Sequence, residues 1–165
     1  MTLLRPIAAT QKDVLRAHVT AYLTELKDLV DGDWDPAAYP FLDVQWSDWG
    51  RHPFFICVQD ADVGFALVRD PQSTGTGLMQ MTEFFIQPSH RGTGIASRAA
   101  CAIFERFPGQ WELQVHQRNP RAIRFWQSCI DKVAQGAPRI RQLDFDGEIK
   151  QHMMFDVADP LRQPS

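Results

Sequence analysis

The segment that leads from an apolar strand into a helix near residue 90 has the composition of an anion-binding turn. It reads Arg91-Gly92-Thr93-Gly94, followed by Ile95, Ala96 and Ser97. Glycine lets the backbone come close to a bulky anion, and the first free N–H groups of a helix point at that anion with the positive end of the helix dipole behind them. The guanidinium of Arg91 adds a fixed positive charge. We therefore expect a phosphate-binding site here.

One ionisable residue lies in the apolar strand that precedes this turn. Alternation over residues 78–86 predicts two faces, one with Met79, Met81, Glu83 and Phe85 and the other with Gln80, Thr82, Phe84 and Ile86. Apolar neighbours raise the pKa of a carboxyl and favour a chemical role for Glu83. A paired structural carboxylate at the sheet edge is the competing interpretation.

The remaining elements follow from hydrophobic periodicity and turn signals. A helix is expected from about residue 11 to 30, and an irregular aromatic segment with a short helix over 42–49 comes next. Strands over 54–58 and 63–68 are joined by residues 59–62, and a polar loop spans 71–77. Then come a helix over 94–107, a strand over 111–115, a helix from Asn119 to about 136, and a hairpin around Asp146-Gly147. This order predicts a mixed sheet with helices on its faces.

Composition narrows the class of protein. The 165 residues suit one globular domain, with 44% hydrophobic and 22% charged residues, and the net charge of −3 argues against nucleic acid as a partner. Cys57, Cys101 and Cys129 lie far apart in apolar surroundings, which indicates reduced thiols. No segment is long and apolar enough to span a membrane, and no metal-binding spacing occurs. We expect a soluble cytoplasmic protein without a metal.

Other glycine-rich sites fit less well. A dinucleotide-binding turn would need a third glycine where Ser97 stands, and it would open the domain rather than follow antiparallel strands. A nucleotide P-loop would need Lys-Ser or Lys-Thr after the turn. An ordinary strand-to-helix connection is the remaining alternative.

Two motifs together resemble the GNAT superfamily of acyl-CoA-dependent N-acetyltransferases. They are Arg91-x-x-Gly94-x-Ala96 and Asn119-x-x-Ala122-x-x-Phe125-Trp126, and the resemblance covers roughly residues 54–134. The strand Glu-Phe-Phe-Ile and the segment Phe107-Pro108-Gly109-x-Trp111-Glu112 are similar to a poorly characterised bacterial branch. The resemblance implies one acyltransferase domain over residues 1–165, of the mixed α/β (α+β) class, with a mostly antiparallel sheet of six to seven strands and about four helices.

The resemblance also assigns residues to acetyl-CoA, the co-substrate. The amides of the glycine turn would hold its pyrophosphate, the strand before the turn would bond its pantetheine, and the second helix would touch its arm. The residues implied are Phe85, Ile86, Arg91, Gly92, Thr93, Gly94, Ile95, Ala96, Ser97, Asn119 and Phe125.

In such an enzyme an amine attacks the acetyl group directly in a ternary complex, and a base must first deprotonate it. Glu83 is the candidate, and His116 is a weaker one that is more simply a loop hydrogen-bonder. Trp126 stands where the family often has a tyrosine acid, and an indole N–H is not an acid. Tyr22 and Tyr39 are the available substitutes.

The amino-terminal segment is expected to form the acceptor pocket, with Tyr22, Trp34 and Tyr39 as substrate-binding residues. Its carboxylates predict a small, cationic amine acceptor, although solvated carboxylates explain the charge equally well. The main alternative to an N-acetyltransferase is a catalytically idle acyl-CoA sensor or interaction module. Whether a homodimer completes the site is left open.

Overall fold

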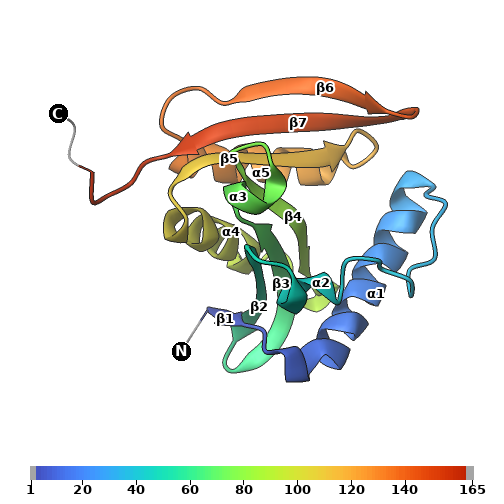
Figure 1. Ribbon diagram of the computed structural model, residues 1–165. Helices are drawn as coiled ribbons and strands as arrows, with labels where there is room; N and C mark the ends of the chain where they lie inside the picture. Colours follow the sequence, from blue (N-terminus) through green and yellow to red (C-terminus); the bar gives the residue numbers. More distant parts are fainter. Residues whose placement is uncertain (1–2, 163–165) are drawn as a thin grey trace.

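The computed structural model describes residues 3–162, and Figure 1 shows one mixed sheet with helices on both faces. Within these residues the sheet has seven strands in the order β1-β2-β3-β4-β5-β7-β6. The elements are β1 Leu4–Pro6, η1 Ala9–Gln11, α1 Lys12–Val30, α2 Val44–Ser47, β2 Arg51–Val58, β3 Ala61–Arg69, α3 Pro71–Thr74, β4 Met79–Ile86, η2 Pro88–His90, α4 Ile95–Arg106, β5 Gly109–His116, α5 Pro120–Val133, β6 Arg139–Phe145 and β7 Glu148–Val157. This confirms the predicted fold class.

The sheet is divided where β4 meets β5. These two strands are parallel and pair at just two positions, Met79 with Trp111 and Gln80 with Glu112, whereas the other strand pairs are antiparallel. Both strands continue beyond this short contact, β4 to Ile86 and β5 to His116. The unpaired lengths leave an opening through the middle of the sheet.

A β-bulge on β4 turns Glu83 toward one side of the sheet. Leu67 of β3 pairs with Glu83 and the next residue pairs with Met81, so Thr82 is the extra residue, and its hydroxyl donates to the Leu67 carbonyl at 3.0 Å. The predicted strict alternation is therefore wrong. Met79 and Met81 share a core with Ile86, not with Glu83 and Phe85, because the bulge shifts the register by one residue.

Each face of the sheet has its own core. Helices α4 and α5 cover one face, where the largest buried side chains include Phe104, Trp111 and Ile130. Helix α1 covers the other face through Leu15 and Val19, which pack with a smaller cluster that includes Phe65, Phe85 and Leu67. The opening between β4 and β5 therefore connects the two faces of the sheet, each of which has its own core.

Local predictions were mostly right about element type and less accurate about ends. The connection predicted over residues 59–62 is a two-residue turn in which Gln59 and Asp60 have φ of 50° and 67°, so β3 starts at Ala61. Strand β1 was not predicted, and the expected loop over 71–77 begins with α3, whose first turn is capped by Asp70. The predicted α1, α5 and the carboxy-terminal hairpin are confirmed.

Candidate active site

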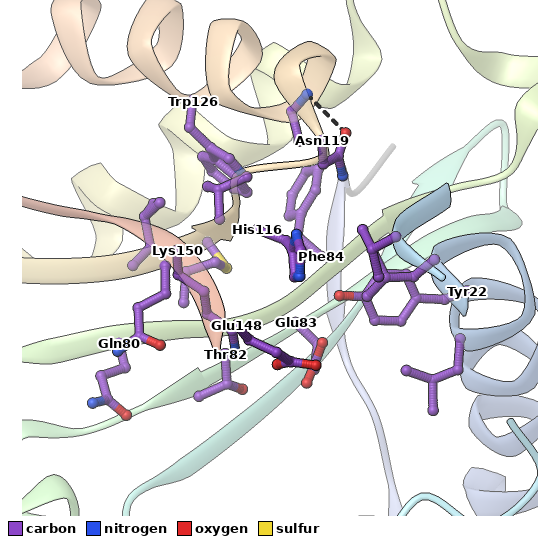
Figure 2. A pocket seen from close by; sticks show the side chains of 18 of the residues that line it. Tyr22, Gln80, Thr82, Glu83, Phe84, His116, Asn119, Trp126, Glu148 and Lys150 are labelled. Carbon is purple, nitrogen blue, oxygen red and sulfur yellow. Dashed lines mark hydrogen bonds between the residues drawn. The ribbon is translucent and has the colours of Figure 1, made fainter. Parts of the chain in front are cut away.

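A cavity of about 520 Å³ lies at the opening between β4 and β5. Side chains of α1 and the following loop form one side of it, and residues at the start of α5 form the other. Its lining consists of Tyr22, Leu23, Leu26, Val30, Trp34, Gln80, Met81, Thr82, Glu83, Phe84, Glu112, Leu113, Gln114, Val115, His116, Asn119, Ala122, Trp126, Glu148 and Lys150. Figure 2 shows Glu83 and Glu148 near the centre, with the Tyr22 hydroxyl directed toward them and Trp126 on the α5 side.

Among the residues that line the cavity, Glu83 has a pKa that its surroundings raise into the range useful for proton transfer. Its side chain is half-buried and lines the cavity. Burial raises the pKa of its carboxyl to about 7, while hydrogen bonds from Tyr22 and Tyr39 and the charge of Lys150 oppose that rise. Burial and the neighbouring carboxylate raise the pKa of both tyrosines well above the usual value. The tyrosines are thus donors to Glu83, and Glu83 can exchange a proton near neutral pH.

A second carboxylate lies where β4 and β5 still pair. Glu112 is buried, accepts a hydrogen bond from Gln80 at 2.5 Å and contacts the His152 Nε2 at 2.8 Å. The His152 Nδ1 is buried without a hydrogen-bond partner among the described residues. Gln80 and Glu112 line the cavity, so this network forms its closed end.

His116 and Asn119 stand where β5 turns into α5. The His116 Nδ1 accepts from the Arg118 amide at 3.1 Å, which leaves Nε2 as the N–H that can act as a donor. The Asn119 side chain accepts from the Ala122 amide at 3.2 Å and caps α5, as Figure 2 shows by a dashed line. Its amide nitrogen is the atom left to meet a ligand.

The glycine turn before α4 has the geometry that an anion site requires. Gly92 and Gly94 have φ of 78° and 84°, and a Cβ on either would meet nothing within 4 Å. The amides of Gly92, Thr93 and Gly94 donate to no acceptor within residues 3–162, and α4 begins at Ile95 with its own free amides. A row of unpaired N–H groups at the start of a helix can bind an anion.

Arg91 does not present a free guanidinium to this turn. Its Nη1 and Nη2 bind both carboxylate oxygens of Glu25 on α1 at 2.8 and 2.9 Å, and its Nε donates to the Ile86 carbonyl at 2.9 Å. The group also lies over the Phe85 ring, 5.5 Å from its centre. The side chain therefore links the turn to the helix that borders the cavity.

Only some of the predicted site residues line the cavity. Glu83, Tyr22, Trp34 and Asn119 line the cavity. Tyr39 does not line the cavity, although its hydroxyl interacts with Glu83. The glycine turn, Phe85, Ile86 and Phe125 also lie outside it, and Phe125 packs on Phe84 with ring centres 5.7 Å apart. Glu83 is on an internal strand of the sheet, but β4 does not pair with β5 at this residue, so the alternative of a structural carboxylate at a strand edge stays open.

Several polar residues of the cavity were not predicted. Glu112, Glu148, Lys150 and Gln80 come from three strands that approach each other only in the folded chain. A polar residue inside an apolar strand, as Glu112 is between Trp111 and Leu113, was the available signal. Nothing in the hairpin pattern singled out Glu148 or Lys150.

Neither a metal cluster nor a membrane span occurs in the described part of the chain. Across residues 3–162, no three His, Cys, Asp or Glu side chains are grouped so that they could hold a metal ion. In the same range, no helix has the length and apolar character needed to cross a membrane.

Comparison with known proteins identifies the class. The model of the acetyltransferase (GNAT) family matches residues 15–129, so the chain belongs to this family. No curated protein matches it significantly.

Solved structures share the fold at low sequence identity. An acetyltransferase from Thermus thermophilus is 18% identical over 93% of this chain and 96% of that one, with a TM-score of 0.67. The aminoglycoside acetyltransferase AAC(6')-Ib, solved with ribostamycin and coenzyme A, is 13% identical over 93% and 92%, with a TM-score of 0.69. A chimera of spermidine N-acetyltransferase SpeG from Vibrio cholerae and hSSAT is 14% identical over 94% and 96%, with a TM-score of 0.57.

Proposed function

We propose that this acetyltransferase moves the acetyl group of acetyl-CoA to the primary amine of a small acceptor by direct attack in a ternary complex. The observation that carries the proposal is Glu83, a carboxyl with a pKa of about 7 on the wall of a cavity that passes between β4 and β5. Neighbours solved with coenzyme A or acetyl-CoA and an amine substrate support the same reaction. The free thiols of Cys57, Cys101 and Cys129 suit a reducing compartment, so we place the reaction in the cytoplasm.

Acetyl-CoA would lie on the α4–α5 side of the sheet. The amides of Gly92 to Ser97 would hold its diphosphate, and the side of β4 that does not pair with β5 at Phe85 and Ile86 would bond its pantetheine arm. Asn119 and Phe125 at the start of α5 would contact that arm. The thioester would then face Glu83 through the opening.

The acceptor would enter from the α1 side, bounded by Tyr22 and Trp34. An alkylammonium has a pKa of about 10.4, so it needs a base before its nitrogen can attack. Ionised Glu83 takes that proton, the nitrogen bonds to the acetyl carbon, and the carbon–sulfur bond then breaks. The departing thiol has a pKa of about 8.5, so it leaves as a thiolate without the tyrosine that Trp126 replaces. The nitrogen loses its second proton as the amide forms, and that proton balances the charge of the thiolate.

The charges of the cavity attract a protonated amine. Glu83, Glu112 and Glu148 line it, against Lys150 as the one lysine or arginine of the lining. The acidic amino-terminal segment contributes less than its sequence suggests, because Glu25 pairs with Arg91 and Asp43 with Lys12. The attraction thus centres on the cavity itself.

Release of free thiol from acetyl-CoA on a panel of primary amines tests the proposal. We expect at least one amine to be acetylated, with product mass increased by one acetyl group. An idle acyl-CoA sensor would bind acetyl-CoA in a calorimetric titration and turn over none of the amines. Absence of both binding and turnover would contradict both functions.

A further inference from the structure

Two arginines lie directly opposite each other on β2 and β3, next to the candidate active site. Arg51 pairs in register with Arg69, Arg69 with Gln80 of β4, and Gln80 with Glu112 of β5. Residues opposite each other across strands point to the same face of a sheet. Gln80 and Glu112 line the cavity and the two arginines do not, so the arginine pair lies beyond the lining on the same face of the sheet.

Within residues 3–162 this arginine pair has one carboxylate partner, Asp48, at the limit of an ion-pair distance. The Arg51 side chain is 8% exposed, and its nearest carboxylate oxygen, on the half-exposed Asp48, is 4.0 Å away. Among residues 3–162 the Arg51 guanidinium donates no hydrogen bond, and the Nε atoms of both arginines are buried without a partner. Arg69 donates through Nη2 to the Ser73 carbonyl at 2.6 Å. Like charges opposite each other are destabilising, and more so when buried.

The missing partner is an anion, and the neighbourhood indicates its source. Burial and the charge of Arg69 lower the pKa of Arg51, as expected for a cation held beside another. Tyr39 is close enough to interact with both Arg51 and Glu83. A molecule whose amine meets Glu83 thus has the arginine pair nearby on the same face. Guanidinium forks match carboxylates in shape as well as charge.

We propose that Arg51 and Arg69 bind a carboxylate of the acceptor, which makes the substrate an amino acid or a similar compound with both an amine and a carboxylate. The inference rests on the proposed N-acetylation. It replaces a purely cationic acceptor with a zwitterionic one, because the acidic cavity wall attracts the ammonium and the arginine pair attracts the opposite end.

Matched sets of acceptors test this directly. Each set contains an amino acid, its carboxamide and its decarboxylated amine, and thiol release from acetyl-CoA gives kcat/KM for each. We expect the amino acid to exceed the other two at least tenfold in one or more sets. In Arg51→Gln and Arg69→Gln, loss of a charge-assisted hydrogen bond should lower that value about 10- to 100-fold. The loss for the decarboxylated amine should be at least tenfold smaller.

Two further variants keep the test sharp. Arg51→Lys retains the charge without the fork, so its kcat/KM for the amino acid should lie between those of wild type and Arg51→Gln. Because this variant keeps a cation at the position, it tests the pair even if the glutamine variant folds poorly. Arg5→Gln removes an arginine that already has a carboxylate partner, Asp62, and should leave the preference intact. A preference for the carboxamide or the decarboxylated amine in every active set, or equal losses for all acceptors in both glutamine variants, would overturn the proposal.

A binding measurement separates failure of this site from failure of the proposed function. Thermal unfolding is followed with glycine, acetate, phosphate or chloride in wild type and Arg51→Gln. If no amine is acetylated, stabilisation by glycine or acetate that disappears in Arg51→Gln still supports a carboxylate site. Stabilisation by phosphate or chloride alone, without a carboxylate preference, would assign the pair to an inorganic anion and contradict the proposal, as would no stabilisation by any of them.

Discussion

The two sides of the opening in the sheet are built by different means. On the α4–α5 side, the candidate acetyl-CoA site consists of main-chain amides at Gly92 to Ser97 and the unpaired edge of β4. On the α1 side, the candidate acceptor site consists of side chains that converge from α1, β4, β5 and β7, among them Tyr22, Glu83 and Lys150. The first site depends on backbone conformation, and the second depends on individual functional groups.

Substitutions on the two sides of the opening should therefore have different effects on binding and turnover. Changes that strain the backbone of the turn should weaken cofactor binding and leave the chemistry of bound substrates intact. Changes of single atoms on the acceptor side should leave cofactor binding intact and alter turnover or its pH dependence. Arg91 is the exception, because it belongs to the turn and is bound to α1.

The largest effect should come from Glu83→Gln. This change removes the proton acceptor while it preserves the size of the side chain, so kcat should fall about 100- to 10,000-fold. Calorimetric titration should give an unchanged affinity for acetyl-CoA. Turnover within a factor of about three of wild type would remove Glu83 from the mechanism.

Unfolding of the same variant provides its control. The pKa of Glu83 is raised from 4.5 to about 7 in the folded protein, so the folded state binds the proton more tightly. Wild-type stability should therefore fall as pH rises from about 4.5 to about 7, with the full loss present above that range. Glu83→Gln lacks this loss and should gain stability over wild type across the same interval. Its inactivity then cannot be assigned to unfolding.

On the cofactor side, Gly94→Ala should weaken acetyl-CoA binding up to about tenfold, since the helix-terminal amides lose their alignment with the anion. Gly75→Ala is the matched control. Gly75 has φ of 71°, close to the 84° of Gly94, and a Cβ on either would meet nothing within 4 Å. Both variants should lose about 1 kcal/mol of stability from the strained backbone, but only Gly94→Ala should change the affinity. Equal affinities in the two variants would contradict a pyrophosphate site at the turn.

Tyr39→Phe should change pH dependence more than rate. The Tyr39 hydroxyl donates to Glu83 and opposes the rise of its pKa, so its removal should raise that pKa further. The acidic limb of the kcat profile should move to higher pH, with kcat on the plateau changed little because Tyr39 lies outside the cavity lining. A large loss on the plateau without movement of the limb would instead indicate direct contact with the acceptor.

The smallest effect concerns the Arg91–Glu25 pair. Because both side chains are partly exposed, at 27% and 43%, a double-mutant cycle with Arg91→Gln and Glu25→Gln should give a coupling of about 0.5 kcal/mol. The two variants should raise the KM of the amine to a similar extent. If Arg91→Gln weakens acetyl-CoA binding in the Glu25→Gln background as well, Arg91 is a phosphate ligand and not a link between the two sides.

The cofactor side could be predicted from the sequence better than the acceptor side, because it depends on local backbone conformation. The glycine turn and the Asn119 cap are local, so their residues adjoin in the chain and their conformations follow from residue type. Glu83 was identifiable because it is a lone carboxyl in an apolar strand. The bulge at Thr82 was not, because it depends on how β4 pairs with β3 and parts from β5.

The acceptor side required the three-dimensional structure. Glu112, Glu148 and Lys150 meet because β5 and β7 are neighbours in the sheet, and Arg51 faces Arg69 through strand register. None of these pairs has a characteristic spacing in the chain. The Arg91–Glu25 contact joins residues 66 positions apart and diverts a guanidinium that the local motif had assigned to phosphate.

The pH dependence of kcat with saturating acetyl-CoA and amine, compared between wild type and Glu83→Gln, tests the central claim most directly. Wild-type kcat should fall below a midpoint near pH 7 with the slope of a single proton, since protonated Glu83 cannot accept the proton of the amine. The residual activity of Glu83→Gln should lack this limb. An acidic limb with the same midpoint and slope in the variant would contradict Glu83 as the base.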